Sequence, residues 1–313
     1  MTDRIVEHSR EMIRVGSKSF FAAARIFDPP TRESAFMLYA WCRYCDDRID
    51  GQELGHGASE AGDGCGLERL EALENETRRA LAGESVDHPA FAALRRVVER
   101  HRIPERHPLE LIEGFRMDVE RRAYPDLEST LDYCYHVAGV VGVMMAHVMG
   151  VDDEAVLDRA SDLGIGFQLT NIARDVMDDA AVDRVYLPGD WLESAGVDDV
   201  AEIENRSAVA AVVRRLLEEA DRYYESSVAG IRELRPRHAW AIAAAKRVYA
   251  DIGRVVRARG SRAWDERAVV GKPRKVWLVA AAGLDAWVAT RLRKGAASPP
   301  REGLYRRPRL ESS

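Results

Sequence analysis

Polar side chains recur at a fixed interval in the stretch Gly166-Phe-Gln-Leu-Thr-Asn-Ile-Ala-Arg-Asp-Val-Met-Asp-Asp179, where most of the other residues are apolar. Asn171, Asp175 and Asp179 follow one another every four residues, so an α-helix carries all three on one face. Gln168 lies one turn earlier and can join them. Burying such oxygens without a partner costs free energy. Oxygen ligands without Cys or His favour Mg²⁺ or Mn²⁺ over Zn²⁺, so the stretch predicts a helix that holds a hard divalent cation.

A second acidic group lies in Cys42-Arg-Tyr-Cys-Asp-Asp-Arg-Ile-Asp50, at the end of another helical stretch. Asp46 and Asp50 are four residues apart, which puts their carboxylates on one helix face with Cβ atoms roughly 5–6 Å apart. Like charges at that spacing destabilise an isolated helix, and acidic side chains near a helix C-terminus oppose its dipole. A bound cation would offset both penalties. A solvated acidic face is the alternative interpretation.

Arginines accompany both acidic stretches. Arg43 lies on the first, Arg174 lies on the second, and Arg184 follows shortly after. Guanidinium groups suit bidentate contacts with phosphate oxygens, although each of these arginines could also form an ordinary surface salt bridge. Mg²⁺ usually takes one or two carboxylates and completes its shell with phosphate oxygens and water. The two stretches therefore predict a metal-bridged diphosphate better than a free metal ion.

Helical periodicity dominates the rest of the chain, few segments alternate with period two, and Gly and Pro mostly mark helix ends. We therefore expect an all-α fold of about ten helices in a single orthogonal bundle. The expected helices are Ser34–Cys45, Leu67–Ala82, His88–His101, Pro108–Arg122, Leu131–Met149, Asp153–Asp179, Val209–Arg232, Trp240–Arg259 and Lys275–Arg293.

Composition excludes several classes of protein. The chain has 313 residues, of which 46% are hydrophobic and 31% are charged, and this balance argues against disorder. Its net charge of −6 argues against nucleic acid as a partner. Four cysteines are too few for a disulfide scaffold and suit a reducing compartment. The charged N-terminal residues do not resemble a signal peptide, so we expect a cytoplasmic protein.

Two segments fall outside the helical pattern. Residues 51–66 include six glycines and predict a flexible loop. Residues 295–313 carry prolines and arginines and predict a flexible basic tail, which could touch anionic lipid headgroups or simply fray. We expect residues 1–294 to form one domain.

The longest apolar run extends from Val137 to Val151 and is interrupted only by His147. As a helix it would span about 22 Å, which is short of the ~30 Å hydrocarbon core of a membrane. It also contains Gly139, Gly142 and Gly150. We expect a buried helix that lines a cavity or packs closely on a neighbour.

Together these residues resemble the squalene and phytoene synthases, which join two prenyl diphosphates head to head. That family's acidic motifs match Asp46 to Asp50 and Asn171 to Asp179, and the resemblance covers roughly Ser17 to Arg274. The stretch Leu38-Tyr-Ala-Trp-Cys-Arg43 is most similar to bacterial phytoene synthases. Four further matches lie in order along the chain: Gly16-Ser-Lys-Ser-Phe20, Gly114-Phe-Arg-Met-Asp118, Tyr133-Cys-Tyr-His-Val-Ala-Gly-Val-Val-Gly142 and Arg184-Val-Tyr-Leu-Pro188.

The resemblance implies an isoprenoid-synthase fold with a central cavity between the acidic helices, and it implies a role for each matched residue. The implied ligands of Mg²⁺ or Mn²⁺ are Asp46, Asp50, Asn171, Asp175 and Asp179. The implied diphosphate contacts are Ser17, Lys18, Arg43, Arg174, Tyr249 and Arg267. The cavity near the reacting carbons would be lined by Phe20, Tyr39, Tyr133, Val137, Gly139, Val141 and Gln168, with the glycines leaving room for a prenyl chain. Tyr39 and Tyr133 would join the four aspartates as catalytic residues, because aromatic faces stabilise cations.

The implied reaction converts two geranylgeranyl diphosphates, through prephytoene diphosphate, into 15-cis-phytoene and two diphosphates, as a step of carotenoid biosynthesis. A dehydrosqualene or squalene synthase that uses farnesyl diphosphate is the alternative, and a non-catalytic assembly factor of the same fold is a remote one. We expect no NADPH, and the sequence contains no Gly-x-Gly-x-x-Gly fingerprint. A hydrocarbon product favours peripheral contact with the inner face of the membrane and with downstream carotenoid enzymes.

Two other patterns have plainer interpretations. Cys42 and Cys45 have the spacing of a redox or zinc pair, but no second pair accompanies them, so we interpret them as small buried residues. His136 and His147 are interpreted as packed helix residues rather than metal ligands.

Overall fold

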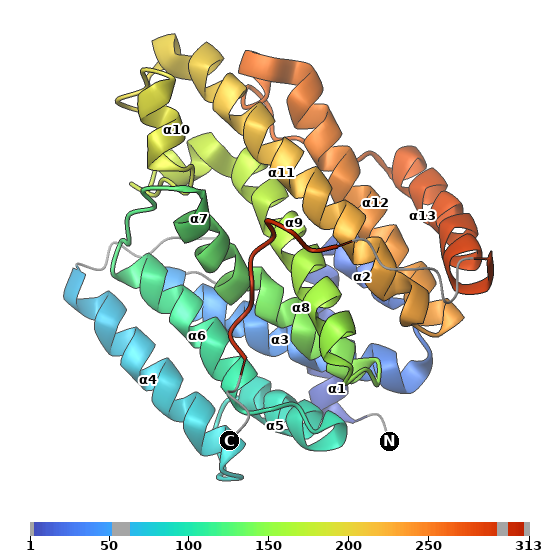
Figure 1. The fold of residues 1–313 in the computed structure, drawn as a ribbon. Helices are drawn as coiled ribbons and strands as arrows, with labels where there is room; N and C mark the ends of the chain where they lie inside the picture. The colour runs from blue at the N-terminus through green and yellow to red at the C-terminus, as the bar shows by residue number, and fades with distance from the viewer. Residues whose placement is uncertain (1–2, 52–62, 293–299, 310–313) are drawn as a thin grey trace. The chain divides into compact units, whose positions relative to one another are not determined.

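The structure, a computed structural model, describes residues 3–51, 63–292 and 300–309. Every regular element in these residues is helical, which confirms the all-α prediction (Figure 1). Packing divides the chain into two compact units. The first comprises Met1–Arg122 and Val143–Asp152, and the second comprises Ala123–Gly142 and Asp153–Ser313. None of the described helices has both the length and the apolar character needed to cross a membrane.

The first unit is built around the helix that carries the first acidic motif. Its helices are α1 (Arg4–Gly16), α2 (Lys18–Ala24), α3 (Pro29–Asp50), α4 (Asp63–Leu81), α5 (Pro89–His101) and α6 (Arg106–Val119). The Asp28 side chain accepts a hydrogen bond from the Thr31 amide and caps α3, which ends at Gly51 in a left-handed conformation. α3 packs against α1 and α5 and buries Trp41 completely. It extends beyond the expected end at Cys45, so both Asp46 and Asp50 are helical.

The predicted glycine-rich loop differs from the structure at its end. α4 begins at Asp63, so residues 63–66 belong to a helix rather than to the loop. Residues 52–62 lie outside the described part of the chain. A Cβ atom at Gly66 would make an ordinary van der Waals contact with Val119 of α6, at 3.4 Å.

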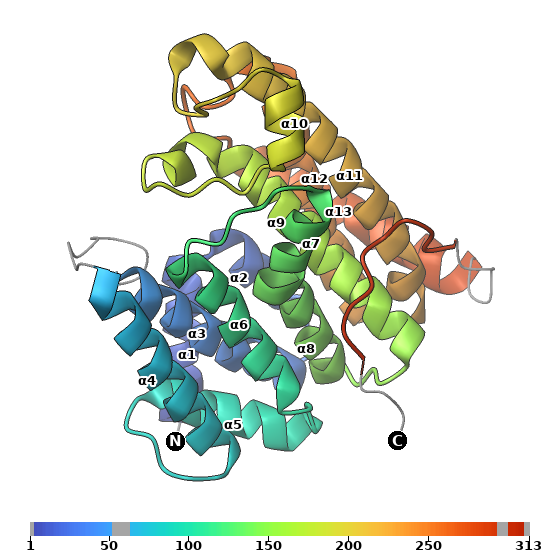
Figure 2. The same ribbon diagram turned by 60° about the vertical axis from the view of Figure 1, so that its left-hand side comes forward.

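The second unit is built around α9, which carries the second acidic motif (Figure 2). α9 packs against α11 and α12, and α12 packs in turn against α13. The helical segments from Leu127 onward are α7 (Leu127–Cys134), η1 (Tyr135–Gly139), α8 (Val140–Val148), α9 (Glu154–Ala180), α10 (Gly189–Ser194), η2 (Ile203–Asn205), α11 (Arg206–Glu233), α12 (Pro236–Arg259), η3 (Gly260–Arg262), α13 (Lys272–Trp287) and η4 (Val288–Leu292).

The expected helix Leu131–Met149 is divided into α7, η1 and α8, because five residues from Tyr135 to Gly139 form a π-helical turn. Such turns are rare and recur at functional sites. Here the turn lies within the Tyr133–Gly142 motif.

Glycines bring η1 and α8 into direct backbone contact with α9. A Cβ atom on Gly142 would lie 2.3 Å from the carbonyl oxygen of Ala160, and one on Gly164 would lie 2.2 Å from that of Ala138. At Gly139, Ser161 Oγ occupies the corresponding space. At Gly139 and Gly142, α9 fills the space into which a side chain would project. The cavity role of Gly139 stays a prediction. We call this contact the glycine seam.

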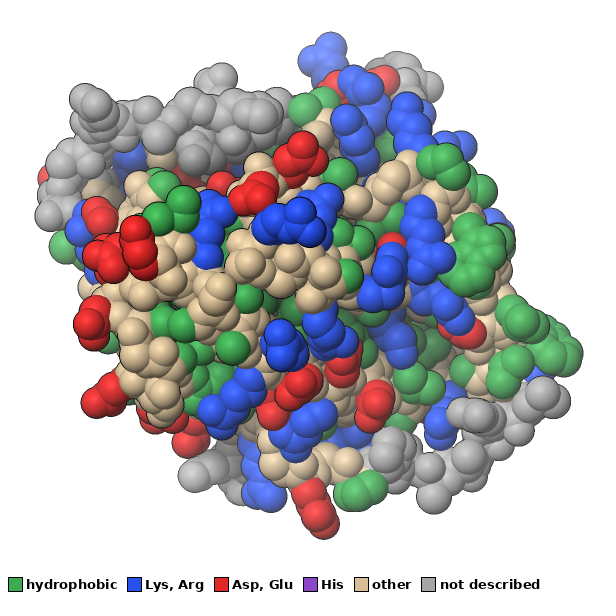
Figure 3. Space-filling model, turned by 90° about the horizontal axis from the view of Figure 1, so that it is seen from above, with side chains coloured by type: hydrophobic (Ala, Val, Ile, Leu, Met, Phe, Trp, Pro, Cys, Tyr) green, Lys and Arg blue, Asp and Glu red, His purple; other side chains and the backbone are tan. Residues whose placement is uncertain are grey.

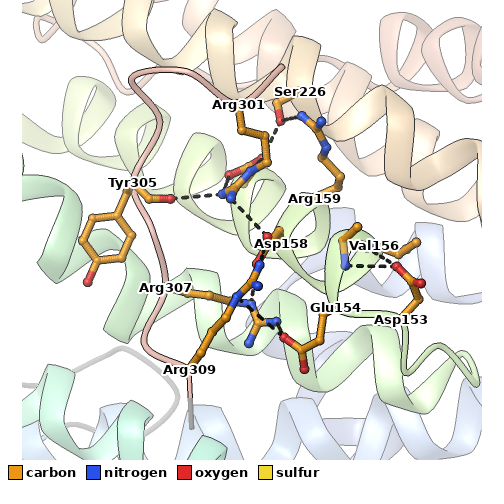
Figure 4. Close-up of polar contacts among 12 residues, drawn as sticks. Asp153, Glu154, Val156, Asp158, Arg159, Ser226, Arg301, Tyr305, Arg307 and Arg309 are labelled. Carbon is orange, nitrogen blue, oxygen red and sulfur yellow. Dashed lines mark hydrogen bonds and ion pairs between the residues drawn. The ribbon is translucent and has the colours of Figure 1, made fainter. Parts of the chain in front are cut away.

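Residues 300–309 differ from the predicted flexible tail, because they dock along α9 (Figure 4). Arg301 forms a bidentate pair with Asp162, at 2.9 Å and 2.6 Å from its two carboxylate oxygens. Arg307 has no exposed side-chain surface and donates its Nε–H to Asp158 over 2.8 Å. The Tyr305 hydroxyl donates to the Asp132 carboxylate over 2.7 Å. We call residues 300–309 the C-terminal strap.

The glycine seam should tolerate no added methyl group. Gly164→Ala is expected to lower the free energy of unfolding by about 3 kcal/mol, because neither backbone can move away without disturbing a packed helix. Gly271→Ala is the control, since nothing lies within 4 Å of a Cβ at Gly271. Denaturant unfolding measures both changes, and equal stability of the two variants would contradict the close contact.

The C-terminal strap should contribute to stability mainly through Arg307. Arg307→Met is expected to lower the free energy of unfolding by about 3 kcal/mol, because it removes a buried partner of Asp158. Arg309→Met is the control, since this side chain contacts the same carboxylate but is 55% exposed and should cost less than about 1 kcal/mol. An undocked strap would give both substitutions the same small effect in denaturant unfolding.

Candidate active site

Three charged side chains at the end of α3 form a compact cluster. Arg43 donates to Asp46 over 2.9 Å and to Asp47 over 2.6 Å. Its Nε–H is buried and has no hydrogen-bond partner within the described part of the protein. Because an unpaired buried donor is costly, this N–H is suited to an incoming acceptor such as a phosphate oxygen. Asp47 was not a predicted site residue, and it is the carboxylate that holds Arg43 in place.

The carboxyl group of Asp46 has a raised affinity for protons. Burial of the group raises its pKa to about 6 against the opposing effect of Arg43, and Asp50, Asp47 and Asp118 raise it further. The carboxyl group is surrounded by protein atoms even though 45% of the side-chain surface remains exposed. A cation at this position would relieve the repulsion among these carboxylates. Asp118 comes from α6, and its place in the Gly114–Asp118 match was the signal that could have identified it.

The junction between α1 and α2 lies against Tyr39 of α3. A Cβ atom on Gly16 would lie 2.5 Å from the Tyr39 hydroxyl, so only glycine fits at the end of α1. The next residue, Ser17, uses its hydroxyl to cap α2 by accepting from the Phe20 amide over 3.3 Å. Lys18 is exposed and Phe20 is half-buried. The structure therefore brings Ser17 near Tyr39 but already uses the serine hydroxyl as a helix cap.

On α9 the polar row expected from the sequence is present. Asn171 donates its amide N–H to Gln168 Oε1 over 3.2 Å, which leaves its Oδ1 atom as the free acceptor. Oδ1 is buried and has no hydrogen-bond partner among the described residues. An unpaired carbonyl oxygen one turn before Asp175 suits a hard cation, which prefers oxygen ligands.

Two arginines bind the carboxylate of Asp175. Arg174 makes a bidentate contact with it, and Arg267, 92 residues later, reaches Asp175 Oδ2 over 3.0 Å. Tyr249 lies in the same group: burial raises its pKa to about 12, with Arg174 lowering it and Asp175 raising it. Three of the predicted diphosphate contacts thus gather around Asp175. Arg267 also lies 3.5 Å from Asp178, whose side chain is 68% exposed.

Tyr133 belongs to a cluster of tyrosines. Its ring stacks on Tyr186, with centroids 4.6 Å apart, and Tyr124 lies 5.3 Å away. Tyr186 comes from the Arg184–Pro188 match, so two separate motifs meet here. A small hollow beside this cluster is lined by residues that include Asp179, Arg184 and Tyr186. Val137 and Val141 are half-buried in the same unit.

Within the described residues, no group of three His, Cys, Asp or Glu side chains converges as a preformed metal site. Oxygen donors of the kind found on α3 and α9 are those that hard divalent cations prefer. The donors present are carboxylate and amide oxygens, and they are surrounded by arginines. The chemistry that suits such a set is the binding and departure of a diphosphate.

Comparison with known proteins agrees with this chemistry. Residues 13–274 match the family described as squalene/phytoene synthase. The chain belongs to the squalene/phytoene synthase family. A 15-cis-phytoene synthase of Pantoea ananas and a phytoene synthase of Pseudescherichia vulneris are each 49% identical to it over 307 residues, which is 97% of this chain and 98% of theirs. A crystal structure of a dehydrosqualene synthase superposes with a TM-score of 0.79 at 25% identity, covering 89% of this chain and 95% of that one.

The cysteines and histidines of this squalene/phytoene synthase family member have packing roles. Burial, with a further contribution from Asp46, raises the pKa of Cys42 to about 12, and burial raises that of Cys45 well above its ordinary value. Both thiols are free, and neither forms the reactive thiolate that a redox motif requires. His136 contacts the Asp132 carbonyl oxygen over 2.9 Å, and His147 contacts Asp152 over 2.8 Å.

Asn171 offers a test that separates ligand binding from folding. Asn171→Leu is expected to change the free energy of unfolding by less than about 1 kcal/mol, because the Oδ1 atom makes no hydrogen bond. The same substitution should weaken Mn²⁺ binding in the presence of inorganic diphosphate at least about tenfold. Electron paramagnetic resonance of free Mn²⁺ measures this binding.

The control for this test is Asp178→Asn, which removes a 68% exposed carboxylate seven residues along the same helix, outside the Asn171, Asp175 and Asp179 motif. It should leave Mn²⁺ binding within about twofold of the unsubstituted protein, since exposed charges contribute little. Equal weakening by both substitutions would exclude Asn171 as a metal ligand.

Proposed function

We propose that this enzyme is a 15-cis-phytoene synthase that condenses two geranylgeranyl diphosphates head to head through prephytoene diphosphate and releases two diphosphates. The observation that carries the proposal is the identity of about one half, over nearly the whole length, with bacterial enzymes of that name. The two acidic motifs and their arginines are the chemistry that such a reaction needs. The reaction would supply a carotenoid pathway.

The proposed metal ligands are Asp46 and Asp50 on α3 and Asn171, Asp175 and Asp179 on α9. Support comes from the partnerless Asn171 Oδ1 atom and from the raised pKa of Asp46, which both favour a cation nearby. Mg²⁺ or Mn²⁺, when bound with substrate, would neutralise the charge that develops on the leaving diphosphate.

The chain's own cations would bind the diphosphate. Arg43 can donate its unpaired Nε–H. Arg174 and Arg267 can turn from Asp175 to phosphate oxygens when a metal ion takes their place on that carboxylate. Ser17, Lys18 and Tyr249 are proposed as further contacts. Preorganised donors of this kind stabilise a leaving group as its charge grows.

Departure of the diphosphate leaves an allylic cation, which must be protected from water. We assign this protection to apolar and aromatic residues: Phe20, Tyr39, Tyr133, Val137 and Val141. Gln168, a polar residue of the same proposed cavity, would orient the substrate instead. Tyr133 is stacked on Tyr186, so its ring is held in a fixed orientation as it faces a developing charge.

We also propose that the enzyme works in the cytoplasm at the inner face of the membrane. Its proposed substrates carry C20 chains and its product is a C40 hydrocarbon, and each buried CH₂ favours an apolar environment by about 0.8 kcal/mol. A peripheral position would let the product enter the lipid phase and reach the enzymes that consume it.

Product analysis tests the proposal. The purified enzyme with Mg²⁺ is expected to convert geranylgeranyl diphosphate into a C40 hydrocarbon without NADPH, as measured by mass spectrometry. Parallel reactions contain farnesyl diphosphate, with and without NADPH. A C30 product formed in preference would replace the proposal with a dehydrosqualene or squalene synthase, and no product from either substrate would favour the non-catalytic assembly factor.

The matched controls for this reaction are Asp175→Ala and Asp178→Ala, which remove neighbouring carboxylates of α9. Asp175→Ala should reduce turnover at least about 100-fold with the fold retained, because it removes a proposed metal ligand. Asp178→Ala should retain most of the activity, since Asp178 is 68% exposed.

A further inference from the structure

Helix α13 carries apolar side chains on two opposite faces. Its inner face, Leu278, Ala282 and Ala286, is buried in the packing against α12. Four larger apolar side chains point the other way and form what we call the outer face of α13: Val276, Trp277, Leu284 and Trp287, with exposed fractions of 70%, 55%, 65% and 55%. A helix that met only water on its outer side would carry polar residues there.

The outer face is a continuous surface feature. Figure 3 shows hydrophobic side chains gathered at the right-hand edge, the side on which Figure 1 shows α13, next to a band of Lys and Arg side chains. Two tryptophans and a leucine within one 16-residue helix amount to a concentration that single exposed residues elsewhere do not reach. Exposed apolar surface of this kind marks an interaction site.

Positive charge lies at both ends of the outer face. Lys272, Arg274 and Lys275 occupy the first turn of α13, which contains no acidic residue, and Arg291 follows the last turn. Cations at a helix N-terminus oppose the helix dipole. Within the protein Asp251 binds Arg274 over 2.8 Å and 3.2 Å, and Lys272 is exposed. Asp285 is the only acidic residue between Ala268 and Leu292 in the sequence, and Arg247 forms a bidentate pair with it.

These charges favour an anionic lipid surface over a second copy of the chain as the partner of the outer face. In a symmetric pair of two copies, each outer face would meet its own equivalent, and an antiparallel arrangement would set Arg291 of one copy against the basic first turn of the other. That contact brings like charges together. Anionic lipid headgroups complement the cations, while tryptophan and leucine suit the boundary between headgroups and acyl chains.

We propose that the outer face of α13 docks on a bilayer that contains anionic lipid, with the helix lying in the plane of the interface. At 1.5 Å per residue the 16-residue helix is about 24 Å long, which suits a helix lying on a membrane rather than crossing it. This inference deepens the peripheral association proposed above by naming the surface responsible. It is tested without substrate, so its failure would leave the proposed synthase reaction untouched.

Vesicle flotation with the full chain tests the docking. The unsubstituted protein is expected to float with vesicles of phosphatidylcholine mixed with phosphatidylglycerol and to bind weakly to phosphatidylcholine alone. The double variant Leu284→Ser with Trp287→Ser should lower the partition coefficient at least about tenfold, because it removes two large apolar side chains from the interface. Lys272→Gln with Arg291→Gln, which removes an exposed cation at each end of the outer face, should abolish most of the preference for phosphatidylglycerol.

The control is Ile203→Ser, which removes an apolar side chain that is 69% exposed in η2, outside α13. It should bind vesicles as the unsubstituted protein does, and all variants should keep the thermal midpoint because they alter exposed positions. Failure of the unsubstituted protein to bind, or equal binding by the Leu284/Trp287 variant, would overturn the proposal. Sedimentation velocity that shows a dimer dissociated by the same variant, without vesicle binding, would assign the face to a second copy instead.

Discussion

The glycine seam is the constraint on which the second unit depends. The backbone of α9 approaches α8 at Gly142 and η1 at Gly164 so closely that a single methyl group would reach the carbonyl oxygen of the neighbouring segment. This contact fixes α9 by its main chain rather than by side chains that could change rotamer. A helix held in this way can keep Asn171, Asp175 and Asp179 in constant positions.

The charged residues of α9 fall into two groups that have different roles. In its N-terminal half Asp158 and Asp162 are buried, and arginines of the C-terminal strap neutralise them. In its C-terminal half Asp175 is bound by the largely buried Arg174 and the exposed Arg267, and Asn171 keeps an acceptor without a donor. The first half therefore contributes to the fold, and the second half retains unsatisfied chemistry. Aspartate–arginine pairs thus hold the strap in the first half and belong to the candidate active site in the second.

The helices and both acidic rows could be predicted because their signal is local. A spacing of four residues determines which side chains share a face, and α9 runs from Glu154 to Ala180 against an expected Asp153 to Asp179. The contacts that could not be predicted all depend on chain segments far apart in the sequence. The docking of Arg307 on Asp158 spans 149 residues, and the approach of Arg267 to Asp175 spans 92. Composition alone made the strap resemble a flexible tail, and the glycines of the seam could equally have lined a cavity.

The buried thiols give the enzyme a chemical property of its own. Cys45 on α3 and Cys134 on α7 are buried and Cys42 on α3 is half-buried, and desolvation raises the pKa of all three thiols. Oxidants and alkylating agents attack thiolates, which are scarce at neutral pH when the pKa is raised. These three cysteines should therefore react slowly with peroxide. Asp46 directly follows Cys45 in the sequence. The first acidic motif therefore lies next to a thiol that is protected from oxidation by its raised pKa.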